Sequence, residues 1–538
     1  MTQKLLLGDE AVGQAAIDAG ISGAFSYPGT PSTEIFEYIQ RLASSKGVAA
    51  KWSGNEKVAY EEALGMSYIG KRSIVSMKCV GLNVAADPFM CSALANINGG
   101  LVVVVADDPG MHSSQNEQDS RHYAHFAKIP CFEPGDEQEC YDMTREAFRL
   151  SEKYHVPVMV RLVTRLAHSR AKVEPRSARN TRQDLLFKKD FAQWTLLPVN
   201  ARKQFEKLIR KHEELREYSD SSPWNRTFKA VKSKKGIICA GVGLGYLKDA
   251  FAFCDKEAPY LAIGCYPLPI KKISDFLKGK QEILVIEDGY PYIEDYLLGC
   301  AGKGPVIIGR KTGALPSTGE LDPDSVIEAV SSLLKTKKIF PKEKHVNIPK
   351  RPPSLCPGCP HIDTYKALNE ARKDKEPCVV FSDIGCYTLG ALPPHSAIDT
   401  CVEMGASIGM AKGASDGGLK YAVAVLGDST FEHSGIVPLL GAAVANTPIT
   451  VLILDNLTVG MTGTQTTLAQ GDRILELVRG LGIDKEHIRL LNPIPKNHEE
   501  NAGIISQELD FAGLSVIISR RECVQSTRRK LKSSKDSN

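Results

Sequence analysis

The stretch VAVLGDST, Val423–Thr430, decides the fold of this chain. It is a short apolar run that passes straight into Gly, Asp, Ser and Thr, which predicts a buried strand ending where a helix begins. The next apolar run, Ile449–Asp455, also ends in an acidic residue and is followed by Asn456 and Thr458. One crossover helix fits between the two runs, so we expect parallel strands whose carboxyl ends lie side by side.

Short apolar runs of this kind recur through the chain and are bounded by Gly, Asp, Ser or Pro. Strands that are apolar on both faces are typical of parallel sheets. Their alternation with helical patterns predicts an α/β protein of several domains, with parallel sheets flanked by helices. The runs are Ser73–Met77, Leu101–Ala106, Val156–Arg161, Gly236–Ala240, Ile283–Glu287, Val379–Ser382, Tyr421–Leu426, Ile449–Asp455 and Leu514–Ser519.

Two shifts in composition mark domain boundaries. Ser169–Gln183 is polar and precedes a charged amphipathic helix expected over Ala201–Tyr218. Thr336–Pro353 is rich in Lys and Pro, which is typical of a linker. We therefore expect an N-terminal α/β block at 1–180, a charged helical linker at 181–228, a smaller α/β block at 229–345 and a C-terminal α/β block at 346–538.

Composition excludes several classes of protein. The 538 residues are 43% hydrophobic, which excludes a mainly disordered chain. Lys and Arg number 67 against 63 Asp and Glu, whereas a nucleic-acid binder needs a strong basic surplus. No apolar run is long enough for a membrane helix, and the first residues do not form a secretory signal. We therefore expect neither a nucleic acid nor a membrane as a partner.

The cysteines and the basic segments give two further expectations. Fourteen cysteines in a chain without an export signal are expected to be reduced thiols or metal ligands in a cytoplasmic protein. The basic residues gather at Arg202–Lys211, expected as a solvated helix face, and at Arg520–Lys535, expected as a disordered terminus.

The two predicted strand ends carry groups of the kind that can bind magnesium and phosphate. A helix amino terminus after Asp428 favours a phosphate, and a carboxylate beside it can hold Mg²⁺. The side chains of Asp428 and Asn456, the carbonyl of Thr458 and two phosphate oxygens would nearly fill an octahedral site. The alternative is a helix-capping Asp and a turn Asn, both of which are common. The pattern alone leaves both interpretations open.

Gly241–Gly245, GVGLG, resembles a dinucleotide-binding loop only in part. Its third glycine comes one residue early for G-x-G-x-x-G, and no acidic residue stands at a strand end about twenty residues later. A plain turn from strand to helix is the favoured interpretation.

Longer motifs carry a resemblance to a known family. The G-D-S…N pattern of Gly427–Ser429 and Asn456 resembles the Mg²⁺–diphosphate signature of thiamine diphosphate (ThDP) enzymes. Five further segments resemble the large (alpha) subunit of indolepyruvate ferredoxin oxidoreductase, of the 2-oxoacid:ferredoxin oxidoreductase family, and the likeness covers nearly the whole chain. They are Tyr27–Glu34, Trp52–Lys57, Met77–Pro88, Ala106–Glu117 and Gly460–Gln465.

The resemblance implies a ThDP-binding fold and roles for particular residues. Block 1–180 would bind the pyrimidine, block 229–345 would resemble the third domain of transketolase-like enzymes, and block 346–538 would bind the diphosphate. Glu56 matches the glutamate that activates ThDP, Thr30 the threonine near the substrate oxygen, and His112 the loop that binds the 2-oxoacid carboxylate. Without the resemblance these would be an exposed helix glutamate, a turn threonine and a loop histidine.

The diphosphate-side assignments follow from the same resemblance. Gly427, Ser429 and Thr430 would approach the diphosphate, while Asp428, Asn456 and the Thr458 carbonyl would hold Mg²⁺. Cys356, Cys359, Cys386 and Cys523 match cluster ligands in related enzymes, and four thiolates suit a [4Fe–4S] cluster. A four-cysteine zinc site or unligated cysteines are the alternatives. The other cysteines lie mostly in apolar runs and are expected to pack in cores.

The implied activity is oxidative decarboxylation of an aryl 2-oxoacid of the indolepyruvate type. It would yield CO₂ and acyl-coenzyme A and pass electrons through the cluster to ferredoxin. A small γ-type (beta) oxidoreductase subunit is the implied partner, in a dimer of heterodimers. The alternatives are a non-oxidative ThDP-dependent 2-oxoacid decarboxylase or acyl-transfer enzyme, and a silent structural subunit.

Two departures from the family pattern matter. The family's ferredoxin-like domain has runs of C-x-x-C-x-x-C-x-x-x-C-P, and this sequence contains none. We therefore expect electrons to leave through ferredoxin or a separate ferredoxin-like subunit. Cys79 stands where the resemblance suggests a histidine, which puts one polar contact of the active site in question.

Overall fold

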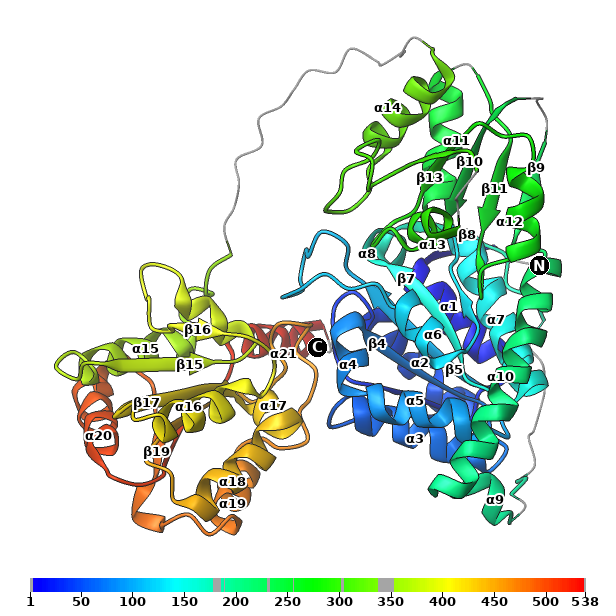
Figure 1. Cartoon of the computed structure of the whole chain (residues 1–538). Helices are drawn as coiled ribbons and strands as arrows, with labels where there is room; N and C mark the ends of the chain where they lie inside the picture. Colours follow the sequence, from blue (N-terminus) through cyan, green and yellow to red (C-terminus); the bar gives the residue numbers. More distant parts are fainter. Residues whose placement is uncertain are drawn as a thin grey trace. The chain divides into compact units, whose positions relative to one another are not determined.

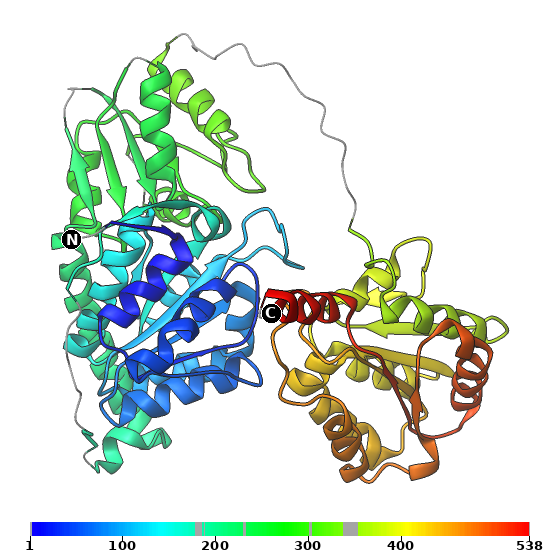
Figure 2. The same cartoon turned by 180° about the vertical axis from the view of Figure 1, so that it is seen from behind.

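The computed structural model describes residues 3–177, 185–187, 189–229, 233–254, 256–300, 304–336 and 353–536. The chain forms two compact units, Met1–His345 and Val346–Asn538, which are coloured blue to green and yellow-green to red in Figure 1 and seen from behind in Figure 2. The Lys/Pro-rich segment Thr336–Pro353 lies almost wholly outside the described residues. The domain limits expected at 180 and 228 stay predictions.

A seven-stranded sheet forms the centre of the first unit, in the order β12-β6-β7-β5-β4-β2-β3. All its neighbours are parallel except β12, which pairs antiparallel with β6. Every residue of β4, β5 and β7 is buried, as a sheet covered on both faces requires. The strands are β2 (Gly23–Ser26), β3 (Ala49–Trp52), β4 (Ser73–Lys78), β5 (Leu101–Asp107), β6 (Cys131–Phe132), β7 (Val158–Val163) and β12 (Cys265–Tyr266).

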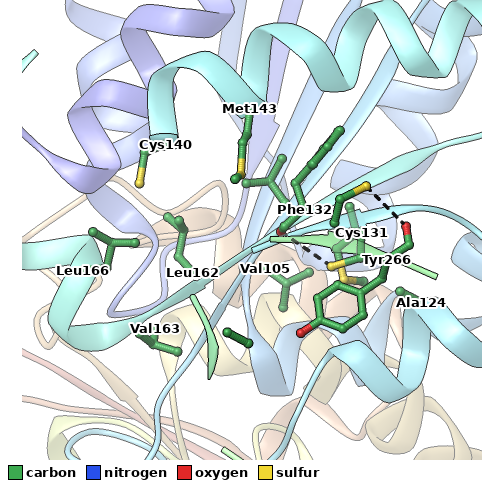
Figure 3. Close-up of a cluster of buried hydrophobic side chains, with 14 of the residues drawn as sticks. Val105, Ala124, Cys131, Phe132, Cys140, Met143, Leu162, Val163, Leu166 and Tyr266 are labelled. Atoms are coloured by element: carbon green, nitrogen blue, oxygen red, sulfur yellow. Dashed lines mark hydrogen bonds between the residues drawn. The ribbon is translucent and has the colours of Figure 1, made fainter. Parts of the chain in front are cut away.

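Helices cover this sheet, and a small antiparallel pair, β1 (Lys4–Leu7) with β8 (Arg170–Val173), lies beside them. Figure 3 shows Cys140 and Met143 of α7 pointing at Phe132 and Leu162 of the strands, so one helix stripe closes this part of the core. The helices are α1 (Gly8–Asp18), α2 (Thr33–Lys46), α3 (Glu56–Tyr68), α4 (Cys79–Val84), α5 (Ala86–Ala95), α6 (Arg121–Ala127), α7 (Glu137–Tyr154) and α8 (Thr164–His168).

A five-stranded sheet, in the order β14-β13-β10-β11-β9, completes the first unit. Gly241, in the turn between β10 and α11, has a φ of +49°, and a Cβ there would meet Glu133 Oε1 at 2.8 Å. The glycine loop therefore packs against the first sheet, as a plain turn does. The elements are α9 (Phe191–Trp194), α10 (Pro198–Ser221), β9 (Arg226–Phe228), β10 (Lys235–Ala240), α11 (Gly243–Cys254), β11 (Tyr260–Ile263), α12 (Ile270–Leu277), β13 (Glu282–Ile286), α13 (Tyr292–Cys300), β14 (Val306–Ile308) and α14 (Pro323–Leu334).

The second unit is built on a six-stranded, wholly parallel sheet in the order β16-β15-β17-β18-β20-β19. The strands are β15 (Cys378–Ser382), β16 (Thr400–Cys401), β17 (Tyr421–Gly427), β18 (Thr450–Asp455), β19 (Ile488–Leu491) and β20 (Ser515–Arg520). The α-helices are α15 (Pro360–Ala371), α16 (Ala406–Asp416), α17 (Asp428–Thr430), α18 (Ile436–Ala445), α19 (Asp472–Gly480), α20 (His498–Asp510) and α21 (Val524–Asp536). Across the described residues, none of the helices has the length and apolar character that a membrane span needs.

The basic tail was predicted wrongly as disordered. Val524–Asp536 forms helix α21 after the last strand. Arg529 on this helix donates from Nη1 to Thr464 Oγ1 at 2.8 Å, which ties the helix to the loop after β18. The high density of basic residues suggested a solvated tail. In the structure, however, one of these residues, Arg529, has a specific hydrogen-bond acceptor in the loop after β18.

Candidate active site

The strand ends expected to hold magnesium lie together in the second unit. Strands β17 and β18 pair in parallel with Gly427 opposite Leu454, so Asp428 and Asn456 follow neighbouring strand ends. Both side chains accept from the Thr458 backbone N–H, Asp428 Oδ2 at 3.1 Å and Asn456 Oδ1 at 3.1 Å. Two oxygen ligands therefore converge at one point, next to the Thr458 N–H, and the role of the Thr458 carbonyl stays a prediction.

The surroundings of Asp428 favour a cation. Asp428 is buried, and burial followed by the negative charge of Asp455 raises the pKa of its carboxyl well above the usual value. A divalent ion would offset the cost of that buried charge. Carboxylate and amide oxygens are ligands that Mg²⁺ accepts, so the residues present fit the ion.

The expected diphosphate residues stand at the start of a continuous helical segment. Asp428–Thr430, a π-helical turn at Phe431–Gly435 and α18 follow one another, and π-turns inside helices are frequent at functional sites. Tyr387 OH donates to Thr430 Oγ1 at 2.9 Å. A Cβ at Gly427 would lie 2.7 Å from the Tyr387 ring, so only glycine fits there.

Asp383 is a third strand-end acid, which the sequence analysis did not single out as a site residue. It follows β15, and its carboxylate accepts from the backbone N–H of Ser407 at 2.6 Å and from Ser407 Oγ at 2.7 Å. Burial raises its pKa to about 7. Asp383 thus fixes the first turn of α16 at the same edge of the sheet. The sequence pattern that predicted Asp428, an Asp directly after a buried strand, applies equally to Asp383.

The structure brings the four expected cluster cysteines into one region of the second unit. Cys356 and Cys359 form a turn before α15, closed by Cys359 N–H donating to the Cys356 carbonyl at 2.9 Å. A Cβ built on Gly460 would lie 3.3 Å from Cys386 Sγ and 4.0 Å from Cys523 Sγ, so this glycine leaves room for both thiols.

The cysteine region adjoins the magnesium residues, because Cys523 N–H donates to the Asn456 carbonyl at 3.1 Å. Burial raises the pKa of Cys386 to about 12, and the charges of the other three cysteines add to the shift. Among the described residues no three of these sulfurs lie within 4.8 Å of one another. A tetrahedral zinc ion with bonds of about 2.3 Å would hold its sulfurs about 3.8 Å apart, so the thiols as they stand do not form a closed zinc site.

Glu56 is a buried residue of the first unit, which excludes the exposed helix glutamate considered as its alternative. It opens α3, whose amino terminus is capped by the Asn55 side chain accepting from Val58 N–H at 2.9 Å. Its exposed fraction is 6%. A Cβ at Gly81 would lie 2.5 Å from Glu56 Oε1, so Gly81 provides the space for the carboxyl group.

Lys78 connects the surroundings of Glu56 to the Thr30 turn. Its ammonium group donates to the carbonyl of Ser113 at 2.7 Å and to its Oγ at 3.1 Å, and Ser113 Oγ donates to the Thr30 carbonyl at 3.1 Å. Burial lowers the pKa of Lys78, while the charges of Cys79, Asp108 and Glu56 oppose that shift. Lys78 was not predicted as a site residue, although a lysine ending an otherwise uncharged buried strand is unusual.

Asp108 fixes the loop around His112, but the His112 side chain itself lies beside Glu320. Asp108 Oδ2 accepts from Ser113 N–H at 2.8 Å and from Ser114 Oγ at 2.7 Å. The His112 side chain is 54% exposed, and its Nε2 lies 3.3 Å from Oε2 of Glu320, in the segment between β14 and α14. Its substrate role stays a prediction.

Cys79 lies within the hydrophobic core. Its exposed fraction is 1%, and burial raises the pKa of its thiol to about 12. The thiol therefore packs as an apolar group, whereas a histidine there would have brought a polar ring.

Two family models match the chain. Residues 14–216 match the model described as pyruvate flavodoxin/ferredoxin oxidoreductase, thiamine diP-binding, and residues 383–488 match the C-terminal TPP-binding domain of thiamine pyrophosphate enzymes. Both describe ThDP-binding domains, and the expected α/β fold with parallel sheets flanked by helices is confirmed.

Known relatives resemble the chain over almost all of its length. The indolepyruvate oxidoreductase subunit IorA of Methanothermobacter thermautotrophicus is 39% identical over 97% of this chain and 87% of the relative. The same subunit of Pyrococcus horikoshii is 37% identical over 96% of this chain and 85% of the relative.

A solved structure shares the fold alone, at 17% identity and a TM-score of 0.52, covering 62% of this chain and 65% of that one. It is the 2-oxoglutarate:ferredoxin oxidoreductase from Magnetococcus marinus with 2-oxoglutarate, coenzyme A and succinyl-CoA bound. The chain therefore belongs to the indolepyruvate oxidoreductase IorA family, the large (alpha) subunits of ThDP-dependent 2-oxoacid:ferredoxin oxidoreductases.

Proposed function

We propose that this chain carries out the oxidative decarboxylation of an aryl 2-oxoacid of the indolepyruvate type, with coenzyme A as acyl acceptor. The observation that carries the proposal is the cysteine region beside the magnesium residues, linked to them through Cys523 and Asn456. A non-oxidative decarboxylase has no use for four gathered thiols at that place. The free cysteines of the described residues suit a reducing, cytoplasmic setting.

Bound ThDP supplies a nucleophilic carbon and an electron sink for the carboxylate that leaves as CO₂. Asp428 and Asn456 would hold Mg²⁺, and Ser429 and Thr430 would present polar groups to the diphosphate at the helix amino terminus. Glu56, confined beside Gly81, exchanges a proton with the aminopyrimidine ring. Its burial keeps bulk water from competing for that proton.

Lys78, Ser113 and Thr30 would orient the substrate. Their hydrogen bonds fix the Thr30 turn and the loop that carries His112 in one arrangement. A buried ammonium group suits the carboxylate of a 2-oxoacid, and such prearranged groups lower the entropy cost of reaction.

A [4Fe–4S] cluster, when bound, accepts electrons one at a time. Cys356, Cys359, Cys386 and Cys523 would ligate it through their thiolates, and Gly460 leaves the space between two of them. Electrons then pass to ferredoxin or a separate ferredoxin-like subunit. We propose assembly with a small γ-type (beta) subunit into a dimer of heterodimers, by analogy with the relatives' being subunits of an oxidoreductase.

Replacement of Asp428 tests the magnesium site. We expect Asp428→Ala to weaken Mg²⁺-dependent ThDP binding by about tenfold or more, because one of the two converging oxygen ligands is lost. Calorimetric titration of ThDP at fixed Mg²⁺ measures the effect. Asp416→Ala is the matched control, since Asp416 is an exposed acid of the same unit paired with Lys412. Equal affinity in wild type and Asp428→Ala would remove the assignment.

Replacement of one cysteine tests the cluster and the oxidative reaction together. Protein purified anaerobically should carry about four irons and equivalent labile sulfide per chain, and Cys386→Ser should carry less than about one. Cys378→Ser, a half-buried thiol on β15, should keep the wild-type content. Wild-type protein that binds ThDP and turns over without iron or acceptor would instead establish the non-oxidative alternative.

A further inference from the structure

A second group of metal-ligating side chains lies in the first unit, formed by Asp9, Glu34 and His168. One ligand atom from each lies within 4.8 Å of both others, and within the described part of the chain no other three His, Cys, Asp or Glu side chains meet that closely. None of the three belongs to the residues assigned to ThDP, Mg²⁺ or the iron–sulfur cluster. The group of Asp9, Glu34 and His168 is therefore separate from the sites proposed for ThDP, Mg²⁺ and the cluster.

Three helix ends bring these residues together. Asp9 stands in the first turn of α1, Glu34 in the first turn of α2, and His168 ends α8. A Cβ on Gly8 would lie 2.1 Å from the Leu166 carbonyl oxygen, so a glycine is required before Asp9 for α1 to approach α8. The close approach fixes the position of the Asp9 carboxyl relative to His168.

Asp9 is the unusual member. It is completely buried, and among the described residues neither carboxylate oxygen has a hydrogen-bond partner. A buried carboxyl group destabilises the fold unless it is hydrogen-bonded, paired or bound to a cation. An ordinary acid at a helix start bonds the free N–H groups there. Burial and the charges of Glu34 and Glu10 raise the pKa of Asp9 well above its usual value. A protonated Asp9 would still leave its oxygens without partners.

The ligand atoms of the other two residues, His168 and Glu34, are spaced as two ligands of one metal ion would be. His168 Nε2 lies 3.6 Å from Glu34 Oε2, which is too long for a hydrogen bond. Ligand bonds of about 2.0–2.2 Å hold two ligands of a tetrahedral ion about 3.4 Å apart, close to that distance. The His168 side chain is 37% exposed, so water can reach the group from that side, whereas Glu34 Oε2 itself is buried and faces the group.

We propose that Asp9, Glu34 and His168 form a binding site for a divalent transition-metal ion. Two carboxylates and one imidazole suit Mn²⁺ or Zn²⁺, whereas the imidazole disfavours Mg²⁺ and Ca²⁺. An ion there gives the buried Asp9 oxygens a partner and neutralises two carboxylates. It also joins the ends of α1, α2 and α8, and α2 begins three residues after Thr30.

Titration of Mn²⁺ into the full-length chain, followed by electron paramagnetic resonance of the free ion, tests the site. Mn²⁺ avoids the cysteine thiols, and the Asp428→Ala background without ThDP removes the other oxygen site. We expect one bound Mn²⁺, and an affinity about tenfold lower or worse in Asp9→Asn, Glu34→Gln and His168→Gln. His487→Gln is the control, because His487 also faces a glutamate, with its Nδ1 2.8 Å from Glu508 Oε2, but belongs to no group of three close ligands among the described residues; it should bind Mn²⁺ as the background does.

Melting temperatures separate a metal site from a structural role of the same side chains. In the presence of chelator, Asp9→Asn should melt no lower than the background, because the substitution removes a buried acid. Mn²⁺ should raise the melting temperature of the background and leave that of Asp9→Asn unchanged. Absence of a bound ion in the background, or equal affinity in the three variants, would overturn the proposal.

Discussion

Glu56→Gln is expected to lower kcat by about 10²–10⁴-fold, the range that a positioned acid–base group contributes. Glutamine fills the same space beside Gly81 and preserves the shape of the buried site, but its amide cannot exchange a proton with the aminopyrimidine. Steady-state turnover at saturating ThDP measures kcat, and calorimetry measures ThDP affinity. We expect the affinity to change by less than about tenfold, because the magnesium and diphosphate residues are untouched.

Glu61→Gln is the matched control for this result. Glu61 lies on the same helix as Glu56, is exposed and pairs with Lys57, so its loss should leave kcat at the wild-type level. A Glu56→Gln enzyme with kcat within about twofold of wild type would remove the proton-exchange assignment. Parallel loss of ThDP binding and turnover would instead indicate a structural role for the carboxylate.

The parts of the fold that the sequence predicted are those in which burial leaves a pattern. All nine apolar runs became strands, each displaced by two residues or fewer at either end. β5 illustrates the reason, since all of its residues are buried and most are Val or Leu. Shorter strands left no comparable pattern. β3, AAKW, lies at a sheet edge with two of its four residues exposed, so it needed no apolar run.

The site residues divide in the same way, into those that a sequence pattern predicts and those that leave no such pattern. Asp428 and Asn456 were predictable because neighbouring strand ends of a parallel sheet must meet. The role of Lys78 was not predictable, because its partner Ser113, and Thr30 to which Ser113 in turn donates, come from two loops distant in sequence. The meeting of Asp9, Glu34 and His168 likewise depends on how three helices pack, and each residue alone resembles an ordinary helix-end side chain.

A buried guanidinium joins the two sheets of the first unit. Arg161, on β7, has no exposed side-chain surface. Its Nε donates to Asp107 Oδ2 at 2.6 Å and its Nη1 to Glu133 Oε1 at 2.5 Å, both in the seven-stranded sheet or its loops. Its Nη2 donates at 3.0 Å to the carbonyl of Asp288, two residues after β13 of the five-stranded sheet. The contact between the sheets therefore depends on a charge with no access to water.

Arg161→Met should lower the free energy of unfolding of the first unit by about 3–5 kcal/mol, since breaking a buried ion pair leaves uncompensated charge. All three tryptophans, Trp52, Trp194 and Trp224, belong to this unit, so their fluorescence during urea denaturation reports on it alone. Arg41→Met, which breaks an exposed pair with Glu10, should cost no more than about 1 kcal/mol.

The pH dependence of that deficit tests its cause. Burial raises the pKa of Asp107 to about 6 even though the charge of Arg161 lowers it. Without Arg161 the pKa rises further, so the folded variant binds a proton that the unfolded chain releases above about pH 4. Stability of the variant then falls as pH rises through the folded pKa. We expect the deficit relative to wild type to shrink from pH 8 to pH 5, and Asp107→Asn combined with Arg161→Met to recover part of it at pH 8. A deficit that is constant across this range, with no recovery in the double variant, would mean that Arg161 stabilises the unit through packing of its aliphatic stem rather than by neutralising Asp107.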